Sequence, residues 1–220
     1  MNRITVLLAE DHNLVREGFR SLLENESDIE VVGEAATGRQ AVDLTRKLHP
    51  AVVVMDIAMP LLNGLEATRQ IRKAFPDTKV LILSAHSDDA YVEQSTKLGA
   101  AGFLLKQTSS QNLATAIREL QKGNTFYSPA VGKRVGSRDR AGELKRRTNR
   151  LSSRQMEVLQ LIAEGRPNKQ IAAELGVSFK TVDKHRQAIM EKLNIHDTAG
   201  LTRYAIHAGI IQSDVEVTII

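Results

Sequence analysis

The chain has 220 residues, a length that suits two small domains, and its 42% hydrophobic and 25% charged residues are typical of a globular rather than a disordered protein. It has no cysteine, which excludes a disulfide framework, a thiolate zinc site and a cysteine nucleophile. No run of 18 apolar residues occurs, and the short apolar stretch at the N-terminus leads directly into Glu10 and Asp11, so we expect neither a membrane span nor a signal peptide.

The formal net charge of +4 is distributed unevenly along the chain. Residues 1–128 carry 14 Lys and Arg against 16 Asp and Glu, whereas residues 129–220 carry 16 against 10. A basic rear half is typical of a module that meets nucleic acid, and an acidic front half indicates a different partner. A chance imbalance of charge is the alternative interpretation at this point.

The front half alternates short apolar runs with amphipathic stretches. The runs are rich in β-branched residues and apolar on both faces, which predicts strands of a parallel sheet covered by helices. The spacing of Val15, Phe19 and Leu22 is that of an amphipathic helix, and the same spacing recurs in residues 113–120. We therefore predict a doubly wound α/β domain with a five-stranded parallel sheet. The predicted strands are Ile4–Ala9, Ile29–Ala35, Ala51–Met55, Val80–Leu83 and Gly102–Leu105.

The segment that follows differs in composition. Residues 128–149 have scattered glycines and little apolar periodicity, and nine Lys and Arg lie between residues 133 and 154 with two acidic residues against them. This composition predicts a linker, which we place at residues 123–148. The basic run is either a solvated tether or a DNA contact, and the sequence leaves both open.

The rear of the chain carries the start and stop signals of four helices. Ser152 and Gln155 fit a capping box at the start of a helix that stops at Gly165. A short helix is predicted over about residues 168–175, a third after Ser178 as far as about residue 193, and a fourth over about residues 198–208. An all-α domain of four helices is therefore expected here.

Polar and charged residues stand at the ends of four predicted strands. The first strand ends in Glu10 and Asp11, the third in Asp56, the fourth in Ser84 and the fifth in Lys106. In a doubly wound sheet these ends meet at one edge. Three neighbouring carboxylates repel one another, and Mg²⁺, which accepts oxygen ligands, would relieve that repulsion. The sequence therefore predicts a magnesium site at this edge.

These residues also suit phosphoryl transfer. A carboxylate of Asp56 held by a cation can attack a phosphoryl group, while Lys106 neutralises the transferred oxygens and Ser84 donates a hydrogen bond. The product would be an acyl phosphate on Asp56. Taken singly, each residue is better explained as a turn residue, a helix cap or a surface charge, so the hypothesis depends on their joint occurrence.

Residues 1–122 resemble the receiver domain of two-component response regulators. The motifs that carry the resemblance are Glu10-Asp11, Asp56-Ile57-Ala58-Met59-Pro60, Gly64, Ser84-Ala85 and Phe103-Leu104-Leu105-Lys106. The resemblance implies a flavodoxin-like fold in which Asp56 accepts phosphate from a sensor histidine kinase. It also implies that Glu10, Asp11 and Asp56, with the backbone carbonyl of Ala58, hold Mg²⁺.

The same resemblance assigns a switch. Lys106 and Ser84 would engage the phosphate, and Phe103 would change rotamer as Ser84 moves toward it. An ordinary core phenylalanine is the alternative reading of Phe103.

Phosphatases of the haloacid dehalogenase type also form an aspartyl phosphate on an α/β sheet. They need a second Asp two residues after the nucleophile as general acid, and Ala58 stands at that position. We therefore expect that the protein is not an enzyme.

The second and third rear helices are joined by a short turn around Gly176, as in a helix-turn-helix. One face of the third helix suits the major groove, because lysines reach guanine acceptors or phosphates and a glutamine pairs with adenine. An ordinary solvated face is the alternative. The predicted inward stripe is Phe179, Val182, Ile189 and Leu193, and the opposite face carries Lys180, Asp183, Lys184 and Gln187.

Residues 149–211 resemble the LuxR-type DNA-binding domain. The matching segments are Leu151–Leu159 with Gly165, Asn168–Ala172, Lys180–Arg186 and Lys192-Leu193. With a receiver, this combination is similar to the NarL/FixJ family of transcriptional regulators; Ser153 departs from it, where Pro is usual. The DNA contacts implied are Lys169, Lys180, Thr181, Asp183, Lys184 and Gln187. The fourth helix either pairs two such domains or packs within its own, through Leu201, Ala205 and Ala208.

Together these expectations describe a cytoplasmic, phosphorylation-dependent regulator of transcription. Its predicted parts are a receiver at 1–122, a linker at 123–148, a DNA-binding domain at 149–211 and a tail at 212–220. The expected partners are a sensor histidine kinase, double-stranded promoter DNA, RNA polymerase and a second copy of the chain on DNA, with no membrane contact. The alternative is a phosphorelay or protein-interaction module whose helical domain binds protein.

Overall fold

Two units make up the chain, residues 1–138 and 139–220. The computed structural model describes residues 3–85, 89–107, 110–127 and 151–211. The predicted tail and residues 128–148 of the predicted linker lie outside the described residues, as does most of the basic run. No helix among the described residues combines the length and the hydropathy that crossing a membrane requires.

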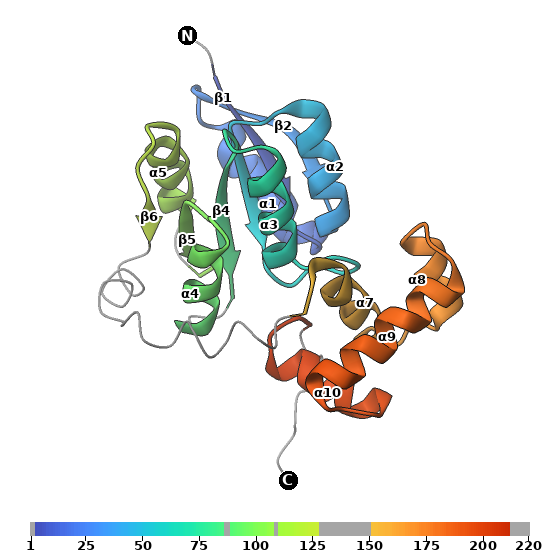
Figure 1. Cartoon of the computed structure of the whole chain (residues 1–220). Helices are drawn as coiled ribbons and strands as arrows, with labels where there is room; N and C mark the ends of the chain where they lie inside the picture. The colour runs from blue at the N-terminus through green and yellow to red at the C-terminus, as the bar shows by residue number, and fades with distance from the viewer. Residues whose placement is uncertain (1–2, 86–88, 108–109, 128–150, 212–220) are drawn as a thin grey trace. The chain divides into compact units, whose positions relative to one another are not determined.

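Six parallel strands form the sheet of the first unit, in the order β2-β1-β3-β4-β5-β6 (Figure 1). The predicted doubly wound fold is confirmed, and the strand order reverses between β1 and β3. The sixth strand was not predicted, because its two residues are too few to show a period. The strands are β1 (Ile4–Ala9), β2 (Ile29–Ala35), β3 (Val52–Asp56), β4 (Lys79–Ser84), β5 (Gly102–Leu105) and β6 (Phe126–Tyr127).

Five helices alternate with these strands in the chain. Two of them begin at side-chain caps: Thr37 accepts a hydrogen bond from the backbone N–H of Gln40 at 3.1 Å, and Asn63 accepts one from Glu66 at 2.9 Å. Such caps satisfy N–H groups that have no partner inside the helix. The helices are α1 (Asn13–Glu24), α2 (Gly38–Leu48), α3 (Gly64–Ala74), α4 (Asp89–Lys97) and α5 (Ser110–Gln121).

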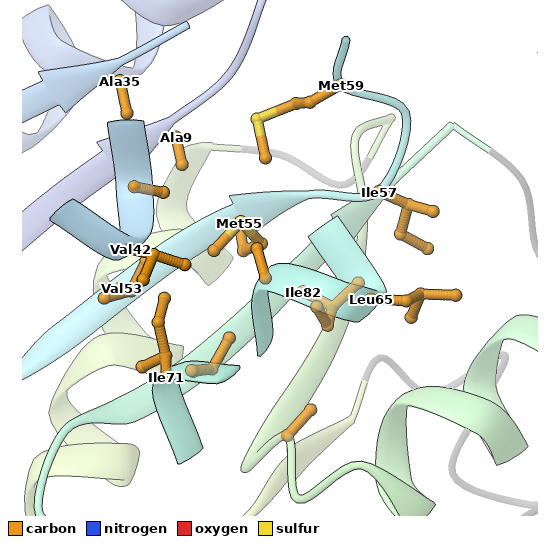
Figure 2. Close-up of a cluster of buried hydrophobic side chains, with 14 of the residues drawn as sticks. Ala9, Ala35, Val42, Val53, Met55, Ile57, Met59, Leu65, Ile71 and Ile82 are labelled. Carbon is orange, nitrogen blue, oxygen red and sulfur yellow. The ribbon is translucent and has the colours of Figure 1, made fainter. Parts of the chain in front are cut away.

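Alternate residues of each strand enter two separate cores. Val53 and Met55 of β3 pack with side chains of α2, α3 and α4, as Figure 2 shows for most of that cluster. Val52 and Val54 of the same strand pack with side chains of α1 and α5. All four are at most 1% exposed, and burying each such side chain stabilises the fold by about 1.5–3 kcal/mol. This two-sided burial is why the strands lack polar alternation.

The second unit has the four helices that the sequence predicted: α7 (Ser153–Ala163), α8 (Asn168–Glu174), α9 (Phe179–Leu193) and α10 (Thr198–His207). The predicted capping box is present, since Ser152 Oγ accepts from the Gln155 backbone at 3.2 Å and Gln155 Oε1 accepts from the Ser152 backbone at 2.9 Å. Gly176, at a φ of +61°, makes the left-handed turn between α8 and α9 that most residues avoid.

One packing prediction in this unit is wrong. Val182 and Ile189 are fully buried as predicted, but Phe179 is 55% exposed, because it is the first residue of α9 and projects past the end of the core. For α10 the alternative of packing within the domain is supported, since Leu201 and Ala205 are fully buried.

Candidate functional site

Three carboxylates converge at the carboxyl edge of the sheet. Glu10 and Asp11 follow β1, and Asp56 is the last residue of the neighbouring β3. One oxygen from each of them and a ring nitrogen of His12 all lie within 4.8 Å of one another. Glu10 is 2% and Asp56 3% exposed, so this is a buried negative cluster that needs a positive charge nearby.

Lys106 supplies part of that charge. Its Nζ lies 2.7 Å from Glu10 Oε2 and 3.0 Å from Asp56 Oδ2. Lys106 follows β5, and its backbone N–H donates to the carbonyl of Ser84, the last residue of β4, at 2.8 Å. The structure therefore brings Glu10, Asp56, Ser84 and Lys106 to the same edge, where the sequence analysis placed them.

Burial and charge perturb both members of the central ion pair. Burial, and then the charge of Glu10, raise the pKa of Asp56 to about 6 against the opposing effect of Lys106. Burial acts to lower the pKa of the Lys106 ammonium, but Asp56 and Glu10 outweigh it and the pKa is raised. A strongly shifted carboxyl group with a specific charged partner is typical of functional sites.

Sequence reasoning missed His12 as part of this cluster. Its Nδ1 lies 2.9 Å from Asp11 Oδ1 and 3.1 Å from Glu10 Oε1, and Asp11 and then Glu10 raise the pKa of the ring. The six histidines show no metal-ligand spacing with one another, so spacing alone does not mark His12. The available signal was the position of His12 directly after two predicted metal ligands.

Arg16 was also missed. Its Nη1 donates to the backbone carbonyl of Glu10 at 2.7 Å, and its Nε donates to Glu34 at 3.0 Å. These bonds fix the loop after β1 to α1 and β2. No sequence signal marked this role, because an arginine on an amphipathic helix is usually a solvated charge.

The donor set of the cluster fits a hard divalent cation. Buried oxygens of Glu10, Asp11 and Asp56 lie together in this cluster, where Lys106 and His12 reach them through ion pairs. Carboxylate oxygens in this arrangement can hold a metal, which would satisfy them.

The loop between β3 and α3 approaches the cluster closely. A Cβ on Gly64 would lie 1.8 Å from the carbonyl oxygen of Asp56, so only glycine lets α3 begin at this place. Ala58 is half-buried two residues after Asp56 in the same loop. Phe103 is fully buried in β5, which is the environment of a core residue in this conformation.

Five of the six predicted DNA contacts lie on α9 of the second unit, and Lys169 lies on α8. Lys169 on α8 and Lys180, Lys184 and Gln187 on α9 are exposed, whereas Asp183 is half-buried. Two of the polar residues contact each other, since Gln187 Nε2 donates to Asp183 Oδ2 at 3.3 Å. Thr181 is half-buried, and its hydroxyl lies 2.9 Å from Ser178 Oγ. The face therefore presents lysines to a partner.

Comparisons with known proteins agree with this geometry. Residues 6–118 match the family described as "Response regulator receiver domain", and residues 149–205 match "Bacterial regulatory proteins, luxR family". The transcriptional regulatory protein MctR of Rhizobium johnstonii is 38% identical over 95% of this chain and 96% of its own length. The response regulator protein VraR of Staphylococcus aureus is 37% identical over 95% of this chain and 99% of its own.

A solved structure supports the same assignment. The response regulator RcsB of Salmonella typhimurium is 30% identical and covers 93% of this chain and 98% of its own, with a TM-score of 0.56. RcsB has also been solved as two dimers bound to two parallel DNAs, with a TM-score of 0.57 over 92% of this chain and 98% of that one. The sequence relatives, the matched domains and the fold all agree, and the chain belongs to the family of response regulators that join a receiver domain to a LuxR-type DNA-binding domain.

Proposed function

We propose that this regulator is switched by phosphorylation of Asp56 by a sensor histidine kinase. The observation that carries the proposal is the position of Asp56, which ends β3 beside Glu10 and 3.0 Å from the ammonium of Lys106. A carboxylate oxygen of Asp56 attacks phosphorus, the bond from phosphorus to the kinase histidine breaks, and that histidine leaves.

The surrounding side chains have distinct roles in this step. Lys106 neutralises the negative phosphoryl oxygens, and the hydroxyl of Ser84, at the end of the adjacent strand, donates a hydrogen bond to one of them. Glu10, Asp11, Asp56 and the backbone carbonyl of Ala58 would hold Mg²⁺, which stabilises negative charge on the transferred group when bound. Carboxylate and carbonyl oxygens suit a hard divalent cation such as Mg²⁺.

Phosphorylation would act by shifting a conformational equilibrium. The lysine that balances Glu10 and Asp56 would have to turn toward the phosphate, and Ser84 would follow. Movement of Ser84 would free space for Phe103, which is fully buried beside β4 in this conformation. We propose that this coupled movement alters the outer face of the receiver and so the availability of the DNA-binding domain.

Substitution of the acceptor tests the first step. Asp56→Asn should abolish hydroxylamine-labile incorporation of radioactive phosphate from a small acyl-phosphate donor, because an amide oxygen does not form the acyl phosphate. The exposed Asp43, which pairs with Arg46 at 3.1 Å, gives a matched control, and Asp43→Asn should incorporate phosphate as the wild type does. Label that persists in Asp56→Asn would place the acceptor elsewhere.

The second domain is proposed to bind double-stranded promoter DNA as a dimer, with RNA polymerase as a further partner. Lys169, Lys180 and Lys184 are exposed on its helix-turn-helix, and RcsB has been solved as dimers on DNA. A face dominated by lysines does not suit a protein-binding alternative, because phosphates are the ligands that such a face fits. The proposal also includes the domain limits: receiver 1–122, linker 123–148, DNA-binding domain 149–211 and tail 212–220.

Removal of one lysine tests the DNA contact. Lys184→Ala should weaken binding to a selected DNA site by about 1–3 kcal/mol if Lys184 contacts a base. Lys97→Ala removes the same charge from an exposed position on α4 of the receiver and should leave binding unchanged. Fluorescence anisotropy over a salt series measures both variants, and wild-type affinity should fall steeply with salt as counterions are released. An affinity independent of salt would contradict the DNA role.

A further inference from the structure

An exposed phenyl ring stands at the start of the helix that the proposed function places on DNA. Phe179 is 55% exposed, and it is the one exposed large apolar side chain of α9 among the described residues. An apolar ring left in water contributes little to folding stability, so packing within the domain does not account for phenylalanine at this position. A partner that covers the ring would account for it.

The backbone that carries this ring is held in place. Ser178 caps α9 by accepting from the backbone N–H of Thr181 at 3.1 Å, and the two hydroxyls lie 2.9 Å apart. Phe179 lies inside that first turn, between the capping residue and the hydroxyl partner. The ring therefore projects from a rigid support, which limits the entropy lost when a partner binds.

The neighbours of Phe179 indicate what that partner is. Lys180 follows it directly, Lys184 lies on the next turn, and both are exposed. Asp183, four residues on, is occupied by its hydrogen bond from Gln187. Exposed lysines on the same helix as an exposed apolar ring are complementary to DNA, where phosphates flank the groove and the thymine methyl group is an apolar feature of its floor.

We propose that Phe179 is a specificity-determining residue that packs against the methyl group of a thymine in the major groove. The inference rests on the proposed DNA-binding function and deepens it by naming what the ring recognises. The first residues of the second helix of a helix-turn-helix are those that reach base edges, and phenylalanine is among the side chains suited to the thymine methyl.

The test combines a substitution in the protein with the removal of one methyl group from the DNA. Sites are first selected from a random duplex pool with the full-length wild type and with Phe179→Ala. We expect a thymine in each wild-type half-site whose preference the variant loses. Replacing that thymine by deoxyuridine, which lacks only the methyl group, should weaken wild-type binding about fourfold, the effect of burying one such group. The same replacement should leave Phe179→Ala binding unchanged.

Two controls keep the outcome specific. Leu14→Ala removes an apolar side chain that is 83% exposed on α1, and it should retain the wild-type response to deoxyuridine. Phe179→Leu keeps an apolar side chain and should retain part of the thymine preference. Thermal unfolding of Phe179→Ala should match the wild type, because the ring is exposed.

The possible failures are separable. If Phe179→Ala selects the same sites and still responds to deoxyuridine, Phe179 does not read thymine, although DNA binding stands. If the variant instead alters the oligomeric state of the DNA-free protein in sedimentation, the ring contacts a second copy and the inference is overturned. If the wild type binds no duplex of any sequence, the proposed DNA function itself fails.

Discussion

In a metal-free buffer near neutral pH, Asp56→Asn is expected to raise the free energy of unfolding of the receiver by up to about 3 kcal/mol. The wild-type fold keeps a carboxylate that is 3% exposed next to that of Glu10, and its pKa is raised from 3.8 to about 6. A shift of about two units corresponds to about 3 kcal/mol of destabilisation of the charged form. The neutral amide of asparagine removes that destabilisation.

The pH dependence of this difference has a definite sign. The folded-state pKa of Asp56 lies above the unfolded value, so the folded protein takes up this proton first as the pH falls. The stability that protonation gives the wild type is fully present below about pH 4 and is lost as the pH rises through about 6. The excess of the free energy of unfolding of Asp56→Asn over that of the wild type should therefore be largest above pH 6 and should decrease between pH 6 and pH 4.

Hydrogen exchange of the β3 and β4 amides in a denaturant series measures this difference in the full chain, because it reports on the receiver alone. Asp43→Asn is the matched control: Asp43 is exposed in an i, i+3 pair, and its substitution should change stability by less than about 0.5 kcal/mol. An Asp56→Asn variant that is less stable than the wild type above pH 6 would show that burial does not destabilise the carboxylate.

Much of the architecture is predictable from the sequence, because the central strands β3 and β4 are buried on both faces. Val52–Asp56 is an uninterrupted apolar run that ends in a carboxylate, and such runs are typical of a parallel sheet between two helical layers. Parallel strands end at one edge, and this rule alone places Asp56 near Glu10 and Lys106. The carboxylate cluster was therefore predictable before any distance was known.

Features that depend on the ends of elements were not predictable in the same way. Phe179 has the spacing of a core residue, but spacing does not show that the ring at the first position of α9 stays 55% exposed. The strand Phe126–Tyr127 forms only because an open edge of β5 accepts it, which two residues of sequence do not reveal. His12 enters the cluster through a side-chain rotamer, and the sequence shows only that it is adjacent.

The same electrostatics predict a large effect of the opposite sign at Lys106. Lys106→Met should lower the free energy of unfolding by about 3–5 kcal/mol above pH 6, because it leaves the buried carboxylates of Glu10 and Asp56 without the ammonium that contacts both. Methionine keeps most of the apolar volume of the lysine stem, so lost packing contributes little. Lys97→Met, in an exposed i, i+4 pair with Glu93, should change stability by no more than about 0.5 kcal/mol.

A double-mutant cycle distinguishes charge balance from a general defect. Once Asp56→Asn has removed one buried charge, Lys106 balances only Glu10, so Lys106→Met should be less destabilising in that background than in the wild type. Lowering the pH should also restore stability to the Lys106→Met variant. Lys106 opposes the elevation of the Asp56 pKa, so without Lys106 the carboxyl group of Asp56 takes up a proton at a higher pH. Equal losses in both backgrounds would mean that Asp56 is not the electrostatic partner of Lys106.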